Sequence, residues 1–211
     1  MGRLLLAVFS LSLIFGMSPV MADAPADFQA GNHYQVIEPP QPTRSGDKVE
    51  VMEFFWYDCQ TCFIIQPALQ QWLGRHGGKI VFRRLPAITD ERMIFFARAY
   101  YAAVALNIQD KVHNPLYVAI NSHRRKLDSE QALAIFFKEN GVDHQAFTNA
   151  FRSNFVAVKV RQARVMSQRY GIQGAPSIAV DGRFRLDSTM VRSAEEFIEV
   201  LDYLVRKQRQ N

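Results

Sequence analysis

The sequence is short of cysteine, and this scarcity already limits what the protein is. Among 211 residues there are only two cysteines, Cys59 and Cys62. A small domain stapled by several disulfides is therefore excluded, and a bridge across two intervening residues closes too small a loop to restrict the unfolded chain much. Because 48% of the residues are hydrophobic, the chain can bury a sizeable core without disulfides or metal ions.

The sequence also lacks an apolar run long enough to cross a membrane. The apolar stretch from Leu4 to Met17 is about 14 residues long, whereas a membrane-spanning helix needs roughly 20. It follows the basic Arg3 and leads to small residues ending at Ala22, which is the pattern of a secretory signal. We predict that residues 1–22 are a signal peptide cleaved after Ala22; retention as an anchor is the alternative.

Strong charge clusters and a zinc-ligand pattern are missing as well. The net charge is +5, and the basic segments 123–126 and 206–210 are short and lack interleaved aromatic residues. Nucleic-acid binding is therefore a poor explanation of the charge, and none is predicted.

The five histidines are scattered along the sequence, whereas a structural zinc ion takes four ligands. We therefore predict neither a metal site nor a cofactor.

The sequence does contain a mixture of strand and helix patterns. Residues 48–56, KVEVMEFFW, are largely apolar on both faces and predict a buried central strand. A short strand is expected before it, over 34–37, and another after it, over 78–85. Between the central strand and the strand over 78–85, a helix is predicted that begins at Cys59 and ends before Gly77. The signal is a set of apolar residues at helical spacing: Phe63, Ile64, Leu69 and Leu73.

Beyond residue 86 the pattern becomes helical before strands return. Helical periodicity covers five segments: 90–107, 114–125, 128–141, 143–153 and 154–171. Asp128 is the expected start signal of the third segment. Asp181-Gly182 between alternating apolar residues predicts a hairpin over 176–187. A last helix is expected after Ser193, which has capping-box spacing to Glu196, so the layout is mixed α/β with an all-helical insertion.

The two cysteines lie where a helix begins after a central strand. A thiolate at a helix N-terminus interacts with unpaired backbone N–H groups and with about half a unit of positive charge, so its pKa falls below roughly 8.5. Cys59 is at that end and is expected to be the exposed nucleophile. Cys62 is one turn further on the same side and is expected to close and reopen the disulfide. Two inert buried thiols are the alternative.

The order of these features resembles the DsbA family of bacterial periplasmic thiol–disulfide oxidoreductases. The resemblance rests on a strand, a C-x-x-C pair at a helix start, an inserted helical domain, then Ala175-Pro176 and a hairpin, and it covers essentially the whole mature chain. It implies a thioredoxin fold with an inserted all-helical domain. The expected division is a thioredoxin-fold domain over 23–87 and 171–211 and a helical insertion over 88–170.

The resemblance also assigns roles to individual residues. Cys59 resembles the family's nucleophile and Cys62 its buried partner. Pro176 resembles the family's cis proline facing the cysteines; an ordinary trans turn is the alternative. Glu53 matches the family's buried acid, whose raised pKa would let it exchange a proton with Cys62. The alternative is an ordinary glutamate at a strand end with access to water. Substrate contacts are expected from the residues around the pair: Gln60, Thr61, Ala175 and Pro176.

Several positions depart from the family pattern. Gln60-Thr61 stands where well-studied members have Pro-His, and Asp58 adds a negative charge that disfavours a neighbouring thiolate. Both changes favour a weaker oxidant. An ungapped alignment puts Phe82 where the family often has a lysine beside its buried acid, which leaves the charge partner of Glu53 open. Ala175 replaces a bulkier valine.

Three functions are compatible with these features. The first is a monomeric periplasmic oxidase that introduces disulfides into reduced exported proteins and is reoxidised by a DsbB-type, quinone-linked membrane partner. The second is a disulfide isomerase or reductase, although the 36 residues expected between the cleavage site and Cys59 leave no room for a separate dimerisation domain. The third is a binding protein for peptides or copper(I), since two thiolates can hold copper(I).

Overall fold

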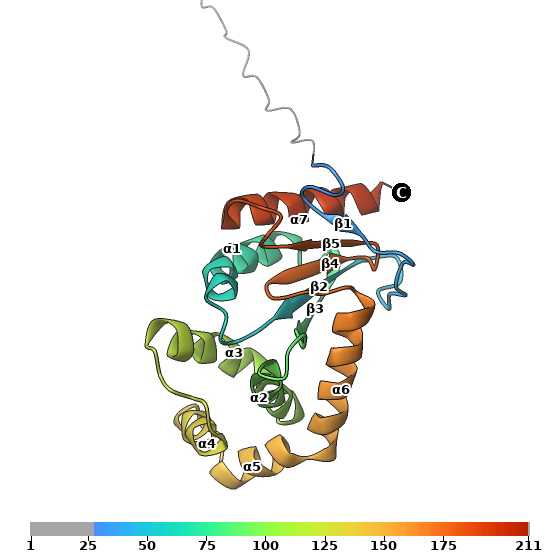
Figure 1. The fold of residues 1–211 in the computed structure, drawn as a ribbon. Helices are drawn as coiled ribbons and strands as arrows, with labels where there is room; N and C mark the ends of the chain where they lie inside the picture. The colour runs from blue at the N-terminus through green and yellow to red at the C-terminus, as the bar shows by residue number, and fades with distance from the viewer. Residues whose placement is uncertain (1–27, 211) are drawn as a thin grey trace, which may run out of the picture.

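A computed structural model describes residues 28–210 as one five-stranded sheet with helices packed on both of its faces (Figure 1). The predicted signal peptide, 1–22, lies outside the described residues. The strands are β1 (Gln35–Val36), β2 (Val49–Phe55), β3 (Ile80–Pro86), β4 (Ser177–Val180) and β5 (Phe184–Asp187). The helices are α1 (Gln60–His76), α2 (Met93–Ala105), α3 (Gln109–Tyr117), the π-helical turn η1 (Val118–Ser122), α4 (Glu130–Glu139), α5 (His144–Arg152), α6 (Asn154–Arg169) and α7 (Ala194–Arg209). In the described part of the chain, no helix is long and apolar enough to span a membrane.

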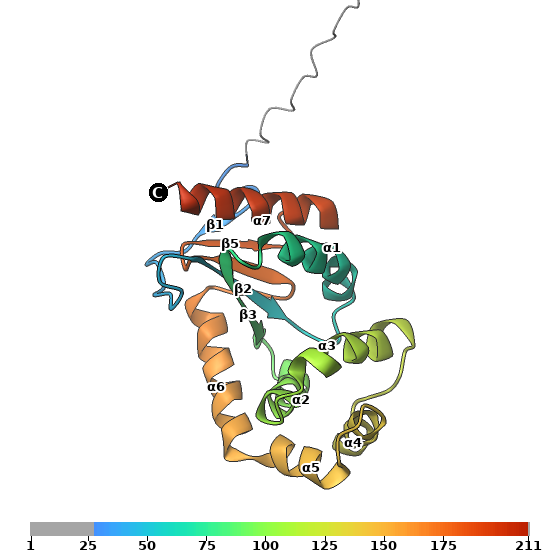
Figure 2. The same cartoon turned by 180° about the vertical axis from the view of Figure 1, so that it is seen from behind.

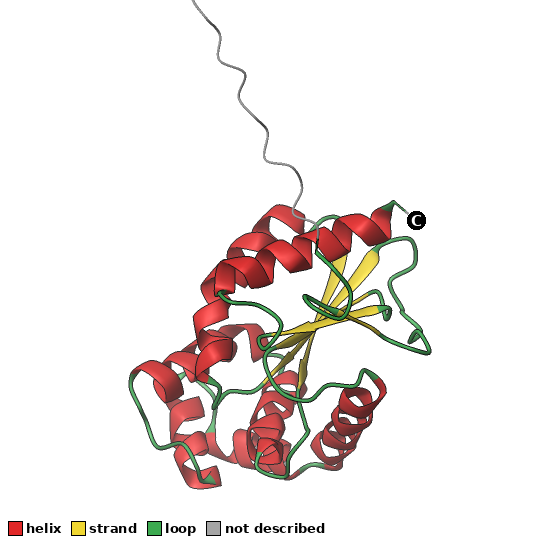
Figure 3. Ribbon diagram, turned by 45° about the horizontal axis from the view of Figure 1, so that its top comes forward, coloured by secondary structure: helices red, strands yellow, loops and turns green. Residues whose placement is uncertain are grey.

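The strand before the cysteines is central and buried, as predicted. The strand order is β1-β5-β4-β2-β3, and all seven residues of β2 are buried. One face of β2 packs Val49 and Val51 against α1 and α7, and the other packs Met52 and Phe54 against the segment that follows α6. Figure 3 shows the helices, in red, on either side of the yellow sheet. Burial on both faces explains why this strand is largely apolar on both faces rather than alternating, with Glu50 and Glu53 as its two buried charged residues.

The hairpin predicted at Asp181-Gly182 joins β4 to β5. Both turn residues have positive φ, 52° and 64°, which is the left-handed region that a tight hairpin turn requires. Gly182 has a second reason to be glycine, because a Cβ at this position would collide with the backbone of Gln41. The hairpin thereby fixes the register in which β4 pairs with β5.

The helical insertion, α2 to α6, lies at the opposite end of the molecule from α7 (Figures 1 and 2). Two predicted helix starts were wrong. The helix expected from 114 begins at Gln109, and the helix expected from Asp128 is capped by Ser129, whose hydroxyl accepts a hydrogen bond from the Ala132 N–H at 3.2 Å. Neighbouring Asp and Ser residues are both good caps, so sequence alone does not choose between them.

Helix α1 buries only part of the apolar face that its spacing predicts, since Leu69 is buried and Phe63 and Leu73 pack at the edge of the core, but Ile64 does not. Ile64 is 56% exposed, and Phe63 and Leu73 are only partly buried. The buried residues of the helix are Cys62, Ile65, Gln66, Leu69 and Trp72.

The cap predicted for the last helix, α7, is confirmed. The Ser193 hydroxyl accepts a hydrogen bond from the Glu196 N–H at 3.2 Å.

Candidate active site

The connection between β2 and α1 brings both sulfurs to the start of the helix. Cys59 is the N-cap of α1, with an extended backbone at φ −127°, and Cys62 lies one turn further. A disulfide joins the two, with 5.2 Å between their Cα atoms. The Cys62 N–H donates to the Cys59 sulfur at 3.0 Å. One of the unpaired N–H groups at the helix start is therefore used to hold the sulfur of Cys59.

The two sulfurs differ in their access to solvent, in the order predicted. Cys59 is 9% exposed and Cys62 is 1% exposed. The expectation of an exposed Cys59 was too strong for the disulfide form, because the Ala175 carbonyl oxygen lies 3.3 Å from the Cys59 sulfur and covers it. Gln60 and Thr61, between the cysteines, are exposed. Cys59 is therefore the more exposed of the two cysteines.

The loop before β4 faces the disulfide from far along the sequence. The Ala175–Pro176 peptide bond is cis, so the alternative of an ordinary trans turn was wrong. The Ser177 hydroxyl donates to the Gly174 carbonyl at 2.8 Å, which ties the two sides of this loop together. Ser177 then pairs with Phe54 of β2. Pairing of β4 with β2 is thus what carries Ala175 to Cys59.

Glu53 lies in the interior beneath the site. The alternative, a glutamate at a strand end with access to water, was wrong. It is 2% exposed. Its carboxylate accepts from Arg84 Nε at 2.8 Å and from the Gln66 amide at 2.5 Å. The register of the parallel pair β2 and β3 puts Arg84, not Phe82, beside Glu53. Desolvation raises the pKa of Glu53, against the opposing influence of Arg84 and Gln66.

Sequence reasoning missed the polar side chains that support this site from the insertion. Tyr57, two residues before Cys59, shares a 3.0 Å hydrogen bond with His113 of α3. Burial lowers the pKa of His113 to about 3, so its ring is neutral. The Asn121 amide donates to the Tyr57 carbonyl at 2.8 Å and fixes the backbone that enters the cysteine turn. Gln66, on α1 rather than in the insertion, is the one supporting side chain that could have been found from the sequence. It lies four residues after Cys62, so both are expected on the same face of the helix.

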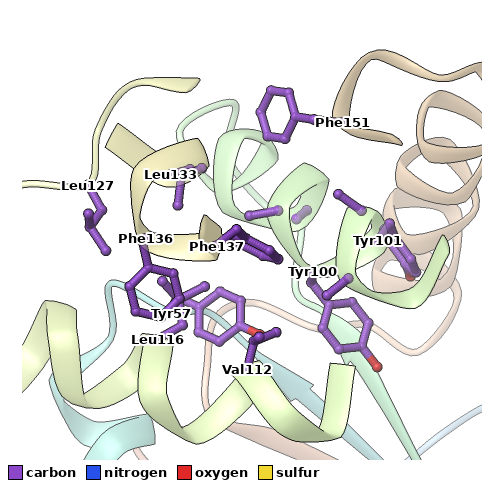
Figure 4. Close-up of a cluster of buried hydrophobic side chains, with 14 of the residues drawn as sticks. Tyr57, Tyr100, Tyr101, Val112, Leu116, Leu127, Leu133, Phe136, Phe137 and Phe151 are labelled. Atoms are coloured by element: carbon purple, nitrogen blue, oxygen red, sulfur yellow. The ribbon is translucent and has the colours of Figure 1, made fainter. Parts of the chain in front are cut away.

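The insertion also surrounds Tyr57 with an apolar cluster, shown in Figure 4. In that view Tyr57 lies among Leu116, Phe136 and Phe137, beside α3 and α4. Both cysteines belong to the same cluster. Within residues 28–210, no three histidine, cysteine or carboxylate side chains gather closely enough to hold a metal ion.

Comparison with known proteins matches this architecture. Residues 50–199 match the DSBA-like thioredoxin domain family. The chain belongs to this family. It is 32% identical over 201 residues to the thiol:disulfide interchange protein DsbA of Burkholderia cepacia, covering 95% of this chain and 93% of the relative.

Solved DsbA structures share the fold over nearly their whole length. The crystal structure of Pseudomonas aeruginosa DsbA superposes with a TM-score of 0.81 at 28% identity, covering 87% of this chain and 96% of the other. DsbA from Xylella fastidiosa gives a TM-score of 0.80 at 28% identity, covering 87% and 98%. As a DsbA-family member with a disulfide in its C-x-x-C pair, the chain is a thiol–disulfide oxidoreductase with a thioredoxin fold and a helical insertion.

Proposed function

We propose that this DsbA-family enzyme is exported to the periplasm and introduces disulfides into reduced exported proteins. The observation that carries the proposal is the placement of Cys59 at the N-cap of α1, where the Cys62 N–H donates to its sulfur. Both the helix terminus and this N–H stabilise a Cys59 thiolate. A pair is oxidising to the extent that its reduced form is stabilised, so this geometry favours electron flow from substrate to enzyme.

The reaction then proceeds by two exchanges. A substrate thiolate attacks the Cys59 sulfur, the Cys59–Cys62 bond breaks, and Cys62 leaves with the electron pair as a thiolate. A second substrate thiolate attacks the substrate sulfur of this mixed disulfide and releases Cys59 as a thiolate. The substrate loses two electrons and two protons in forming its disulfide, and the enzyme pair gains two electrons.

Glu53 is proposed to supply the proton that the departing Cys62 needs. A thiolate at a site as buried as Cys62 is unfavourable, so protonation lowers the cost of opening the disulfide. Glu53 is buried on the adjoining strand, and burial raises the pKa of its carboxyl group, which makes it a competent proton donor and acceptor. Gln66, which contacts Glu53 from α1, keeps the carboxyl group oriented toward the helix.

Substrate contacts are proposed for the residues that frame Cys59. Gln60 and Thr61 are exposed beside the pair, and Ala175 and the cis Pro176 face it. An extended peptide held along the loop at 175–176 would bring its cysteine to the more accessible of the two sulfurs. This is recognition by backbone pairing, which tolerates many substrate sequences.

The remaining part of what we propose concerns export of the protein, its assembly state and its reoxidation in the cell. The segment 1–22 serves as the cleaved signal, and the mature chain acts as a monomer with a thioredoxin-fold domain over 23–87 and 171–211 and an insertion over 88–170. A DsbB-type membrane protein linked to quinone accepts the electrons and restores the disulfide. Fractionation of expressing bacteria, with N-terminal sequencing of the mature protein, tests export and cleavage after Ala22.

A reductase or isomerase is the second candidate, and Asp58 is the observation that favours it. Asp58 is exposed and directly precedes Cys59, so its negative charge opposes the thiolate. Equilibration of the mature enzyme with glutathione buffers, followed by thiol trapping, decides between the two. A reduction potential near roughly −120 mV supports the oxidase, whereas a value near roughly −270 mV makes the protein a reductant and reverses the proposed mechanism.

A further inference from the structure

A cavity of about 740 Å³ lies between the sheet and helix α6, on the side of β2 that faces α6. Its walls come from β2, β3, α2, α6 and the segment before β2. In Figure 1 this region lies beside the orange helix α6. Neither cysteine is among the lining residues, and neither is Ala175 or Pro176. The cavity is therefore separate from the site where disulfide exchange takes place.

The lining of this cavity is strongly cationic. Six basic side chains line it: Arg44, Arg83, Arg84, Lys159, Arg161 and Arg169. Among the described residues, the only carboxylate in the lining is Glu50, which is already paired with Arg83 at 3.3 Å. A cavity with one sign of charge and low-dielectric walls concentrates counter-ions of the opposite sign.

Three of these cations have no partner in the part of the chain that the structure describes. Arg84 is paired with Glu53 across the sheet, but the guanidinium groups of Arg44, Arg161 and Arg169 make no ion pair or side-chain hydrogen bond with any residue in 28–210. Arg161 and Arg169 lie on the same helix, eight residues apart, and both line the cavity. Their forked N–H donors suit a planar oxyanion, such as a carboxylate.

A residue in the cavity wall also carries a buried hydroxyl. Tyr170, directly after α6, is 2% exposed, and its hydroxyl has no hydrogen-bond partner among the described residues. Glu50 and Arg83 are the charged lining residues that influence this hydroxyl. Burial raises the pKa of Tyr170 to about 12, so the group remains a donor at neutral pH. Buried polar groups are rarely left unsatisfied, and an oxyanion would satisfy this one.

The rest of the wall is apolar, which limits the class of ligand. Met52, Leu85 and Val104 line the cavity together with Val158 and Val165 of α6. Those two valines are among the exposed large hydrophobic residues of the protein, at 40% and 44%. A bare inorganic anion would leave this surface uncovered, whereas an apolar body attached to the anion would bury it.

We propose that the cavity beside α6 is a binding site for an organic carboxylate with an apolar body. The carboxylate would lie between the guanidinium groups of Arg161 and Arg169 and the Tyr170 hydroxyl. The apolar body would lie against the valines of α6 and the side chains of β2 and β3. The cavity borders the redox site through Arg84, the ion-pair partner of Glu53, but the proposal does not depend on the reduction potential of the cysteines.

Calorimetric titration of the oxidised mature protein with 2-naphthoate at pH 7 and low salt tests the proposal. Two reference probes separate the contributions: 2-naphthol keeps the apolar body without the carboxylate, and inorganic sulfate keeps charge without the body. Both are expected to bind about tenfold or more weakly than 2-naphthoate, since a hydrogen bond to a charged group supplies at least that factor. Equal binding of 2-naphthol or of sulfate overturns the proposal.

Variants locate the binding. The Arg161→Gln/Arg169→Gln double variant should weaken 2-naphthoate binding about tenfold or more, and Tyr170→Phe should weaken it several-fold. Arg75→Gln is the matched control, because Arg75 is exposed on α1 and unpaired within 28–210. Its affinity should be unchanged; a loss equal to that of the double variant would show non-specific attraction and refute the site.

Amide chemical shifts provide a readout that does not depend on mutation. On addition of 2-naphthoate, the amides of β3 and α6 should shift, and those of residues 58–62 should not. Shifts confined to the cysteine turn would place the ligand at the redox site and refute the proposal. The double variant should keep the circular dichroism spectrum and the reduction potential of the parent, so that any loss of affinity reports on the cavity rather than on unfolding.

Discussion

The buried ion pair between Glu53 and Arg84 should respond very differently to removal of one partner or the other. The Glu53 side chain is 3% exposed and that of Arg84 is 15% exposed. Arg84→Met leaves a buried carboxylate without its cation and, among the described residues, with only the Gln66 amide as a partner. Removing one member of a buried pair costs about 3–5 kcal/mol, and we expect this full loss in the free energy of unfolding at pH 7.5.

Glu53→Gln should lower the free energy of unfolding much less than Arg84→Met does. The amide keeps the shape of the carboxyl group and leaves an oxygen that can accept from Arg84. The cation that remains is partly exposed and can turn its head toward water. We therefore expect the free energy of unfolding to fall by about 1 kcal/mol, which is the usual net contribution of one hydrogen bond.

The dependence on pH provides a sharper test of the same pair. The folded-state pKa of Glu53 is raised above its ordinary value of 4.5, so the native protein binds this proton more tightly than the unfolded chain does. The resulting stability is fully present below pH 4.5 and is lost as the pH rises through the folded-state pKa. Arg84→Met removes the cation that opposes this shift, so its destabilisation should be smaller at pH 5 than at pH 7.5.

Urea unfolding of the oxidised protein at the two pH values, followed by circular dichroism, measures these differences. Arg164→Met serves as the control, because Arg164 pairs with the exposed Glu91 and its loss should change stability by less than about 1 kcal/mol. Equal losses for Arg84→Met and Glu53→Gln would refute the reasoning. So would a loss for Arg84→Met that does not change with pH.

Three further outcomes are expected. Cys62→Ser should accumulate a mixed disulfide between Cys59 and a peptide supplied as its own symmetrical disulfide, seen by mass spectrometry. The Cys59 thiolate attacks the peptide disulfide, one peptide leaves as a thiolate, and the adduct persists because Cys62 is no longer there to release it; no adduct would place the exchange elsewhere. Asp58→Asn should lower the pKa of the Cys59 thiol, measured from the thiolate absorbance at 240 nm, because it removes a neighbouring negative charge; a rise would contradict the charge argument. Ser129→Ala should cost about 1 kcal/mol in urea unfolding through loss of the α4 cap, and an unchanged midpoint would show that another group caps the helix.

The parts of the site that the sequence predicts are those encoded by neighbouring residues. The central strand, the cysteine pair at the helix start and the hairpin at Asp181-Gly182 each depend on a short pattern. Cys59 becomes an N-cap because the strand ends at Phe55 and the helix begins at Gln60, and both boundaries are local. These elements could be predicted because hydrophobic periodicity and turn residues act over a few positions.

The parts that were missed depend on contacts between distant segments. Glu53 pairs with Arg84 because of the register between two parallel strands that are joined by the α1 crossover, and neither strand alone specifies this register. The contact of Tyr57 with His113 spans 56 positions, and that with Asn121 spans 64. Ile64 fits the helical period but is exposed, because an apolar residue need not be buried.

The same packing explains why the helical insertion matters for the chemistry. Val49 and Val51, early in β2, belong to the core formed with α1 and α7, whereas Phe55 and both cysteines belong to the core of the insertion. When the disulfide opens, the Cys62 sulfur is therefore released into an apolar interior, where an unprotonated thiolate is unfavourable. Cys59, at the edge of that core, keeps the access that a substrate needs. On the proposed mechanism, the deeper burial of Cys62 in the core of the insertion makes Cys59 the cysteine that exchanges with substrate, and Cys62 the one that requires a proton from Glu53.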